Sequence, residues 1–233
     1  MGQMISNIKD ALLDLLFPMR CSVCNREGGF LCDGCEPALT RLEQPFCEIC
    51  ADPDSSPLCS WCTAKRPSID VVRAPYMMVG PLKEMVYSLK YRGVRAAAPV
   101  MGRLLAEYLS SHPLPADVLV PVPLQPRRER GRGYNQSELL AREVARESGL
   151  PEDRGLLRRT RDSRPQVSTA TMSERRGNVD GVFECVAGVG GGRVLLIDDV
   201  ATTGATVSAC AGALKDAGAS YVAALVLARQ AQS

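Results

Sequence analysis

The spacing of apolar and polar residues divides the chain into three stretches. Apolar residues recur at helical spacing within residues 1–20, which predicts an amphipathic helix that ends at Pro18. Residues 21–66 offer few apolar side chains from which to build a core of their own. In residues 67–233 short apolar runs alternate with amphipathic segments, which indicates a second and larger domain.

Strands and helices are expected to alternate along the larger domain. The predicted strands cover residues 70–72, 76–79, 118–120, 194–197 and 221–227. The predicted helices cover about residues 82–89, 101–108, 135–148 and 205–217. Apolar strands that alternate with helices are typical of a parallel sheet covered on both faces. The pattern therefore predicts an α/β fold, a parallel sheet with flanking helices, preceded by the small N-terminal domain of residues 21–66.

Cysteine is the residue type with the most uneven distribution. Eight of the ten cysteines form four C-x-x-C pairs, a spacing that lets two thiolates on one tight turn bind the same tetrahedral zinc ion. The candidate metal ligands are Cys21, Cys24, Cys32, Cys35, Cys47, Cys50, Cys59 and Cys62. Two pairs complete one four-thiolate site, so the stretch predicts a double zinc ribbon with one or two structural zinc ions. Short spacers favour pairing in chain order, while interleaved pairing stays open.

A disulfide framework is the alternative use of the same cysteines. Disulfides persist in oxidising compartments, and the N-terminus does not resemble a secretory signal because Lys9, Asp10 and Asp14 interrupt its apolar stretch. No stretch approaches the roughly 20 apolar residues of a membrane span. We therefore expect a cytoplasmic protein with no membrane span, and we favour zinc over disulfides. A thiol-exchange role is favoured less, because it does not need four regularly spaced pairs.

The stretch from Val194 to Thr206 carries the clearest chemical signal. An apolar strand leads directly into Asp198 and Asp199, and small or hydroxylated residues precede the next helix, namely Ala201, Thr202, Thr203, Gly204, Ala205 and Thr206. Free N–H groups and the dipole at a helix start favour a phosphate. The carboxylates would repel it and suit instead the vicinal hydroxyls of a ribose, or a magnesium ion. A sugar-phosphate site is thus predicted at the carboxyl end of a parallel strand, with merely exposed acidic residues as the alternative.

The same thirteen residues resemble the phosphoribosyl-pyrophosphate (PRPP) signature of type I phosphoribosyltransferases. Further motifs extend the resemblance from about Leu15 to Arg229, namely LLFPMRCSVC near the N-terminus, LKYRG at 89–93, PVPL at 121–124, RGRGYNQSELLA at 130–141 and RPQVSTATMSERRGNVDGVF at 164–183. Together they resemble the ComF family of late-competence, DNA-uptake proteins. Members of that family join a double zinc ribbon to a phosphoribosyltransferase domain, which implies the same architecture for this chain.

The resemblance implies roles for individual residues. Asp198 and Asp199 would hold the ribose hydroxyls and organise magnesium, and residues 201–206 would cradle the 5′-phosphate. The residues expected near the pyrophosphate are Lys90, Val122, Pro123, Arg127 and Arg128, followed by Arg130 and Arg132. The alternative for these arginines is a solvated basic face. A flexible loop is expected at 158–176, and its recurring pattern is matched by Gln166, Arg175 and Asn178.

Composition and charge narrow the chemistry. His112 is the single histidine, which removes most serine–histidine, cysteine–histidine and histidine–metal mechanisms. Purine-type transferases carry an acidic residue at the position of Thr202, where it can act as a general base. This chain has threonine there, so its catalytic residues stay unknown. The formal charge of +2 is an average of −3 over residues 1–66 and +5 over the remainder. Any surface for single-stranded DNA is therefore expected on the arginine-rich transferase face.

Two functional classes follow from these expectations. The first is a PRPP-dependent phosphoribosyltransferase, a glycosyltransferase that uses PRPP with magnesium, has an unknown acceptor and acts in DNA uptake during competence. The alternative is a non-catalytic module that senses PRPP, or that binds single-stranded DNA or a partner in the competence machinery. PRPP or another ribose 5-phosphate compound is the expected small-molecule partner.

Overall fold

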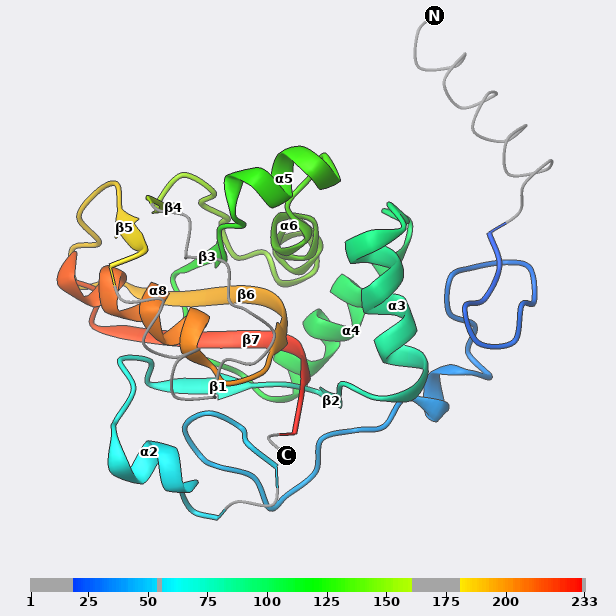
Figure 1. Ribbon diagram of the computed structural model, residues 1–233, viewed down its shortest axis with the longest axis horizontal. Helices are drawn as coiled ribbons and strands as arrows, with labels where there is room; N and C mark the ends of the chain where they lie inside the picture. The colour runs from blue at the N-terminus through cyan, green and yellow to red at the C-terminus, as the bar shows by residue number, and fades with distance from the viewer. Residues whose placement is uncertain (1–18, 54–55, 161–180, 232–233) are drawn as a thin grey trace, which may run out of the picture.

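The computed structural model describes residues 19–53, 56–160 and 181–231. Within these residues the chain forms a parallel sheet with helices on both faces and two cysteine ribbons (Figure 1). The predicted N-terminal helix lies almost wholly outside the described residues. The same holds for most of the loop expected at 158–176 and for Gln166, Arg175 and Asn178.

The central sheet confirms the predicted parallel arrangement. Its strands lie in the order β1 (Val71–Arg73), β7 (Tyr221–Arg229), β6 (Arg193–Ala201) and β3 (Val118–Pro121), and each neighbouring pair is parallel. The short strand β2 (Tyr76–Met77) pairs with the end of β7. The carboxyl ends of the strands therefore meet at one edge, which is where open α/β sheets bind ligands.

Helices cover both faces of this sheet. The first face carries α3 (Gly80–Tyr91), α4 (Ala97–Ser111) and α6 (Gln136–Ser148), and the second carries α8 (Ala205–Asp216). Along β6 the fully buried side chains alternate between the two cores, with Leu195 and Ile197 on one face and Val194 and Leu196 on the other. Among the described residues, no helix combines the length and the apolar character needed to cross a membrane.

Three features differ from the predicted elements. Strand β6 continues beyond Ile197 to Ala201, because its ladder with the long strand β7 also continues. The arginine-rich segment forms a short helix, α5 (Pro126–Arg132), which starts at a proline and ends at Gly133 in the left-handed conformation. Strands β4 (Leu157–Arg159) and β5 (Phe183–Cys185) form a separate antiparallel pair next to α8.

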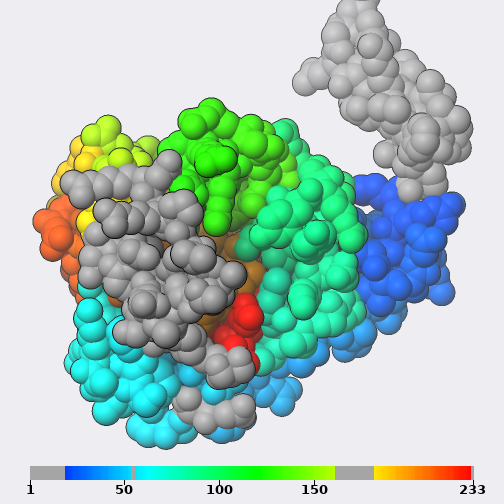
Figure 2. All heavy atoms as spheres, viewed as in Figure 1, coloured from blue at the N-terminus to red at the C-terminus, as the bar shows by residue number. Residues whose placement is uncertain are grey.

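The two cysteine ribbons occupy different places. The first ribbon (residues 19–39, with the 3-10 helix η1 at Glu36–Ala38) lies beside α3 and α4 and adds Phe30 and Leu31 to their core. The second ribbon (residues 46–64, with the short helix α2 at Ser60–Ala64) lies along β1 (Figure 1). The first ribbon projects as a lobe at the side of the molecule, whereas the second merges with the main body (Figure 2).

Candidate functional site

Two buried carboxylates stand at the carboxyl end of β6. Asp198 and Asp199 are 8% and 2% exposed. The Asp198 Oδ1 atom accepts hydrogen bonds from Ser137 Oγ at 2.7 Å and from the Asp199 N–H at 2.9 Å. Lys90 of α3 pairs with Asp199, with 2.9 Å between Nζ and Oδ2. The structure thus brings the predicted Lys90 to the predicted acidic pair.

Burial and neighbouring charges both shift the pKa values of Asp198 and Lys90. Burial raises the pKa of Asp198 to about 7, the neighbouring charge of Asp199 adds to this, and Lys90 and Ser137 oppose it. Burial lowers the pKa of Lys90, but the charges of Asp199 and Asp198 outweigh it, so that the pKa rises overall. Lys90 therefore stays cationic near neutral pH, while Asp198 exchanges its proton there.

The small-residue loop closes the site beside these acids. Its residues Ala201 to Thr206 line a small hollow of about 30 Å³ together with Asp198. Gly204 precedes α8 with a φ of 74°, a left-handed conformation that glycine adopts without strain. The Ala205 N–H donates to Thr203 Oγ1 at 3.3 Å, which fixes the first turn of α8. The predicted phosphate-loop residues are thus brought together at a helix start, the arrangement that binds anions.

A second hollow of about 460 Å³ lies where pyrophosphate was expected. It is lined by Lys90, Tyr91, Gly93, Arg128, Gly131 and Arg132. Lys90 and Arg128 therefore share one cavity. Arg127 and Arg130 lie on the same helix α5 and are exposed, but they are not among the residues that line this cavity. Of the predicted arginines, Arg128 and Arg132 are the two placed beside Lys90.

Two buried polar neighbours of the candidate site are not among the residues that the sequence predicts for it. Asn135 and Ser137 are 3% and 0% exposed at the start of α6. The Asn135 side chain accepts a hydrogen bond from the Ser137 N–H at 3.0 Å and donates one to the Val122 carbonyl at 3.1 Å. The Val122 N–H in turn donates to the Ile197 carbonyl on β6 at 3.0 Å. Asn135 thereby caps the helix and ties the predicted loop of Val122 and Pro123 to the acidic pair. Its place directly before a helix was the available signal.

The cysteines form two centres in chain order. Cys21, Cys24, Cys32 and Cys35 make the first, and Cys47, Cys50, Cys59 and Cys62 make the second; within each, the sulfur atoms lie within 4.8 Å of one another. This confirms the sequential pairing that the short spacers favoured. All ten cysteines lie in the described residues and none forms a disulfide.

Both centres fit zinc. A tetrahedral ion with zinc–sulfur bonds of about 2.3 Å needs sulfur atoms roughly 3.8 Å apart. The Sγ atoms of Cys24 and Cys32 are 3.6 Å apart, and so are those of Cys50 and Cys59. Burial raises the pKa of the Cys47 thiol, but backbone hydrogen bonds outweigh it and bring the pKa to about 7, whereas burial raises the pKa of Cys50 to about 12 and also raises that of Cys62. A thiolate held by backbone N–H groups is the form that binds metal.

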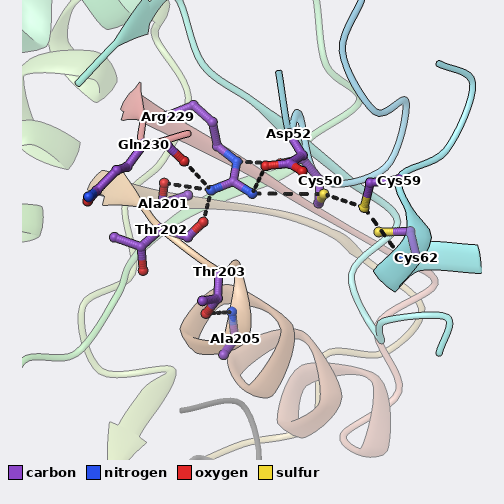
Figure 3. Close-up of polar contacts among 10 residues, drawn as sticks. All are labelled: Cys50, Asp52, Cys59, Cys62, Ala201, Thr202, Thr203, Ala205, Arg229 and Gln230. Atoms are coloured by element: carbon purple, nitrogen blue, oxygen red, sulfur yellow. Dashed lines mark hydrogen bonds and ion pairs between the residues drawn. The ribbon is translucent and has the colours of Figure 1, made fainter. Parts of the chain in front are cut away.

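Arg229, at the end of β7, joins the second ribbon to the phosphate loop (Figure 3). Its side chain is fully buried. On the ribbon side, Nε donates to the Cys50 carbonyl at 3.0 Å and Nη2 lies 3.2 Å from the Asp52 carboxylate. On the loop side, Nη1 donates to the Ala201 carbonyl at 2.9 Å and to the Thr202 carbonyl. Nothing in the local sequence marks this arginine, because a charged residue after an apolar strand usually faces water.

Known proteins resemble this chain over most of its length. A model of the double zinc ribbon domain matches residues 12–69. The chain is 30% identical over 216 residues to the competence protein ComFC of Bacillus subtilis (strain 168), and the alignment covers 85% of this chain and 84% of that protein. The chain belongs to the ComF family. The DNA utilization protein YhgH of Escherichia coli (strain K12) is 30% identical over 217 residues, with 90% of this chain and 89% of that protein covered.

A third relative and two solved structures extend the comparison. Competence protein F of Haemophilus influenzae (strain ATCC 51907 / DSM 11121 / KW20 / Rd) is 27% identical over 211 residues, which cover 85% of this chain and 90% of that protein. Glutamine PRPP amidotransferase from Bacillus subtilis aligns with a TM-score of 0.39 and 25% identity over 57% of this chain. The allosteric regulatory enzyme of purine biosynthesis aligns with a TM-score of 0.37 and 21% identity over 56%. This chain covers 26% of each of these two longer chains.

Proposed function

We propose that this member of the ComF family binds PRPP at the carboxyl end of β6 and transfers its phosphoribosyl group to an acceptor, in a role in DNA uptake during competence. The supporting observation is that two buried carboxylates, Asp198 and Asp199, stand directly before a loop that opens at a helix start. Carboxylates suit ribose hydroxyls and a helix start suits a phosphate. A ribose 5-phosphate carries both groups at neighbouring positions.

The residues around the acids supply the remaining contacts. Lys90 and Arg128 line one cavity, and their cationic groups suit the oxygen atoms of a pyrophosphate. The oxygen donors of Asp198 and Asp199 fit magnesium, which would bring positive charge to the leaving pyrophosphate. In the reaction, the bond between the anomeric carbon and the pyrophosphate oxygen breaks as the acceptor attacks the opposite face. Lys90 would then exchange its partner Asp199 for a ligand oxygen.

A non-catalytic module that binds PRPP or single-stranded DNA is the second candidate, and one observation favours each part of it. Thr202, at the position where purine-type transferases carry an acid, is an exposed side chain that cannot take up a proton. Tyr87 and Tyr91 are 46% and 68% exposed, and the guanidinium groups of Arg92 and Arg132 lie 5.1 and 5.7 Å from the centres of their rings. Exposed rings beside arginines suit the stacked bases of single-stranded DNA.

Calorimetric titration of PRPP with magnesium tests the site. We expect the double variant Asp198→Asn/Asp199→Asn to lose at least about 100-fold in affinity, because each carboxylate provides a charged contact. Asp117→Asn is the matched control, since Asp117 is an exposed aspartate that pairs with Arg193 at the opposite end of β6. Equal affinity in the wild type and the double variant would reject the site. A screen of bases and amines for pyrophosphate release then separates transfer from binding alone.

A further inference from the structure

The guanidinium group of Arg229 is fully buried and is hydrogen-bonded to the protein. A guanidinium group carries its N–H donors in a rigid planar fork, and a buried one must find an oxygen for each direction. Apart from a hydrogen bond from Nη1 to the neighbouring Gln230 carbonyl at 3.1 Å, Arg229 divides its donors between two segments that are far apart in the sequence. The carbonyl of Cys50 and the carboxylate of Asp52 belong to the second ribbon, and the carbonyls of Ala201 and Thr202 belong to the phosphate loop (Figure 3).

The carbonyl contacts determine which way the loop presents its backbone. In a trans peptide the C=O and the following N–H point in opposite directions. Arg229 holds the carbonyls of Ala201 and Thr202 toward itself, and the Gln230 N–H also donates to the Ala201 carbonyl at 3.0 Å. The N–H groups of Thr202 and Thr203 are therefore turned away from the guanidinium. Donors arranged in this way at the start of a helix are the groups that bind a phosphate.

The ribbon contacts of Arg229 reach the second cysteine centre itself. Cys50 is one of its four sulfur donors, and Arg229 Nη2 lies 4.0 Å from the Cys50 sulfur. A loaded four-thiolate centre is negatively charged, so a guanidinium beside it is attracted and oriented. The first ribbon reaches the main body differently, through an ion pair of 2.6 Å between Glu36 and Arg103 on α4. The two centres therefore differ in what their metal would hold in place.

We propose that Arg229 is a positioning residue through which metal in the second centre sets the conformation of the phosphate loop. The functional part of this proposal rests on the proposed PRPP site. The structural part concerns only the conformation of the loop and does not require that PRPP binds. Metal fixes the Cys50 turn, the turn fixes the guanidinium, and the guanidinium fixes the carbonyls of Ala201 and Thr202. Because coupling free energies are reciprocal, a ligand bound at the loop must also tighten the retention of metal at the second centre, and not at the first.

Hydrogen exchange of the loop, followed during stepwise removal of zinc from the full chain, tests the structural part. Alkylation of individual cysteines, read by mass spectrometry, reports which centre has been emptied. We expect exchange in residues 200–206 to rise about tenfold when the second centre empties, the effect of losing one charged hydrogen bond. Emptying only the first centre, as in Cys24→Ser, should leave the loop unchanged.

Two arginine variants provide the matched comparison. Arg229→Lys keeps the positive charge but loses the planar set of guanidinium donors. We therefore expect fast hydrogen exchange in residues 200–206 that no longer responds to metal. Binding of PRPP with magnesium should be roughly tenfold weaker. Arg103→Lys makes the same change at the arginine that holds the first ribbon, and it should leave both readouts at their wild-type values. Asp52→Asn tests the ribbon end separately, because it leaves the carbonyl contacts of Arg229 in place.

The reciprocal experiment measures metal loss with and without PRPP and magnesium. We expect the ligand to slow alkylation of the second centre about tenfold in the wild type and not in Arg229→Lys. Loop exchange that ignores the second centre, or that responds alike in Arg229→Lys and Arg103→Lys, overturns the positioning role. If the wild type fails to bind PRPP while loop exchange still follows the second centre, the proposed function fails and the positioning role stands.

Discussion

The two cysteine ribbons share one motif but have different surroundings. In the first ribbon, Cys24 is exposed and the contact with the main body is an apolar patch plus the Glu36–Arg103 ion pair. In the second, all four cysteines are buried. The Val72 N–H on β1 donates to Ile49 of the second ribbon at 2.6 Å, which joins that ribbon to the edge of the sheet.

This difference shows that equal spacing of ligands does not imply equal roles. The first ribbon is joined to the main body through the buried side chains of Phe30 and Leu31 and through the Glu36–Arg103 ion pair on α4. The second ribbon reaches the carboxyl edge of the sheet through Arg229, next to the candidate site. If the positioning role of Arg229 holds, a metal in the first centre would stabilise a lobe, whereas a metal in the second would also stabilise the loop of the candidate site.

Removal of one ligand from each centre should give the largest contrast. We expect Cys50→Ser to lower the free energy of unfolding by about 4 kcal/mol or more, because loss of metal there also releases the buried Arg229. Cys24→Ser should lower it by no more than about 2 kcal/mol, because its ribbon can open without disturbing the sheet. Urea unfolding with a parallel zinc assay measures both.

Cys185→Ser is the control for these cysteine variants, since Cys185 belongs to neither centre. It should retain full zinc content and nearly wild-type stability. Equal destabilisation by Cys50→Ser and Cys24→Ser would remove the distinction between the ribbons.

A change of pH should also affect the two ribbons differently, but the difference should be smaller than the one between the two cysteine variants. Burial raises the pKa of Asp198 in the folded state from its ordinary value near 3.8 to about 7, so the folded state keeps a proton that the unfolded state loses. Stability should therefore fall as the pH rises from about 4 to about 7, by on the order of 3 kcal/mol, and level off above that. Asp198→Asn should abolish this slope.

Deprotonation of Asp198 is expected to destabilise the second ribbon and not the first, because Arg229 connects the second ribbon with the end of β6. Amide protection factors in residues 46–64 should decline over this pH range relative to Asp198→Asn, while those in residues 19–39 should match the variant. A parallel decline in both ribbons would show that the coupling is global.

The smallest effect is expected where the first ribbon meets α4. Arg103 is 39% exposed at its side chain and contacts Glu36 and Glu107. Because solvent screens partly exposed pairs, Arg103→Ala should cost only about 0.5–1 kcal/mol, measured by urea unfolding. A cost as large as that of Cys50→Ser would mean that the first ribbon is integrated as firmly as the second.

Local patterns explain what could be predicted from the sequence. The apolar run at 194–197, the small residues before α8 and the four cysteine pairs each lie within one short segment, and their geometry follows from that segment. Helix α5 escaped prediction because its side chains are exposed or half-buried and it has no apolar face; only its first proline and Gly133 mark it. Strands β4 and β5 have three residues each, too few for an alternating pattern.

The parts of the site that escaped prediction depend on distant contacts. Ser137 bonds to Asp198 across 61 positions, and Arg229 bonds to Cys50 across 179. The local spacing of apolar and polar residues does not reveal contacts between residues so far apart in the sequence. The family resemblance points to Lys90 and Arg128, but the cavity that they share depends on how α3 and α5 pack in the fold. Burial of a charged side chain is a tertiary property, so Arg229 could be recognised only from the fold.

The bonds of Arg229 also bear on how this chain could be divided and recombined. A division at residue 67, which the composition suggests and which stays a prediction, runs between β1 and the second ribbon. A C-terminal part separated there would lose the Cys50 carbonyl and the Asp52 carboxylate, two of the acceptors of the Arg229 guanidinium. Shuffling of modules between relatives is therefore constrained. We expect the second ribbon to be exchangeable between relatives only together with the end of β7 and the loop after β6, a constraint that the first ribbon does not share.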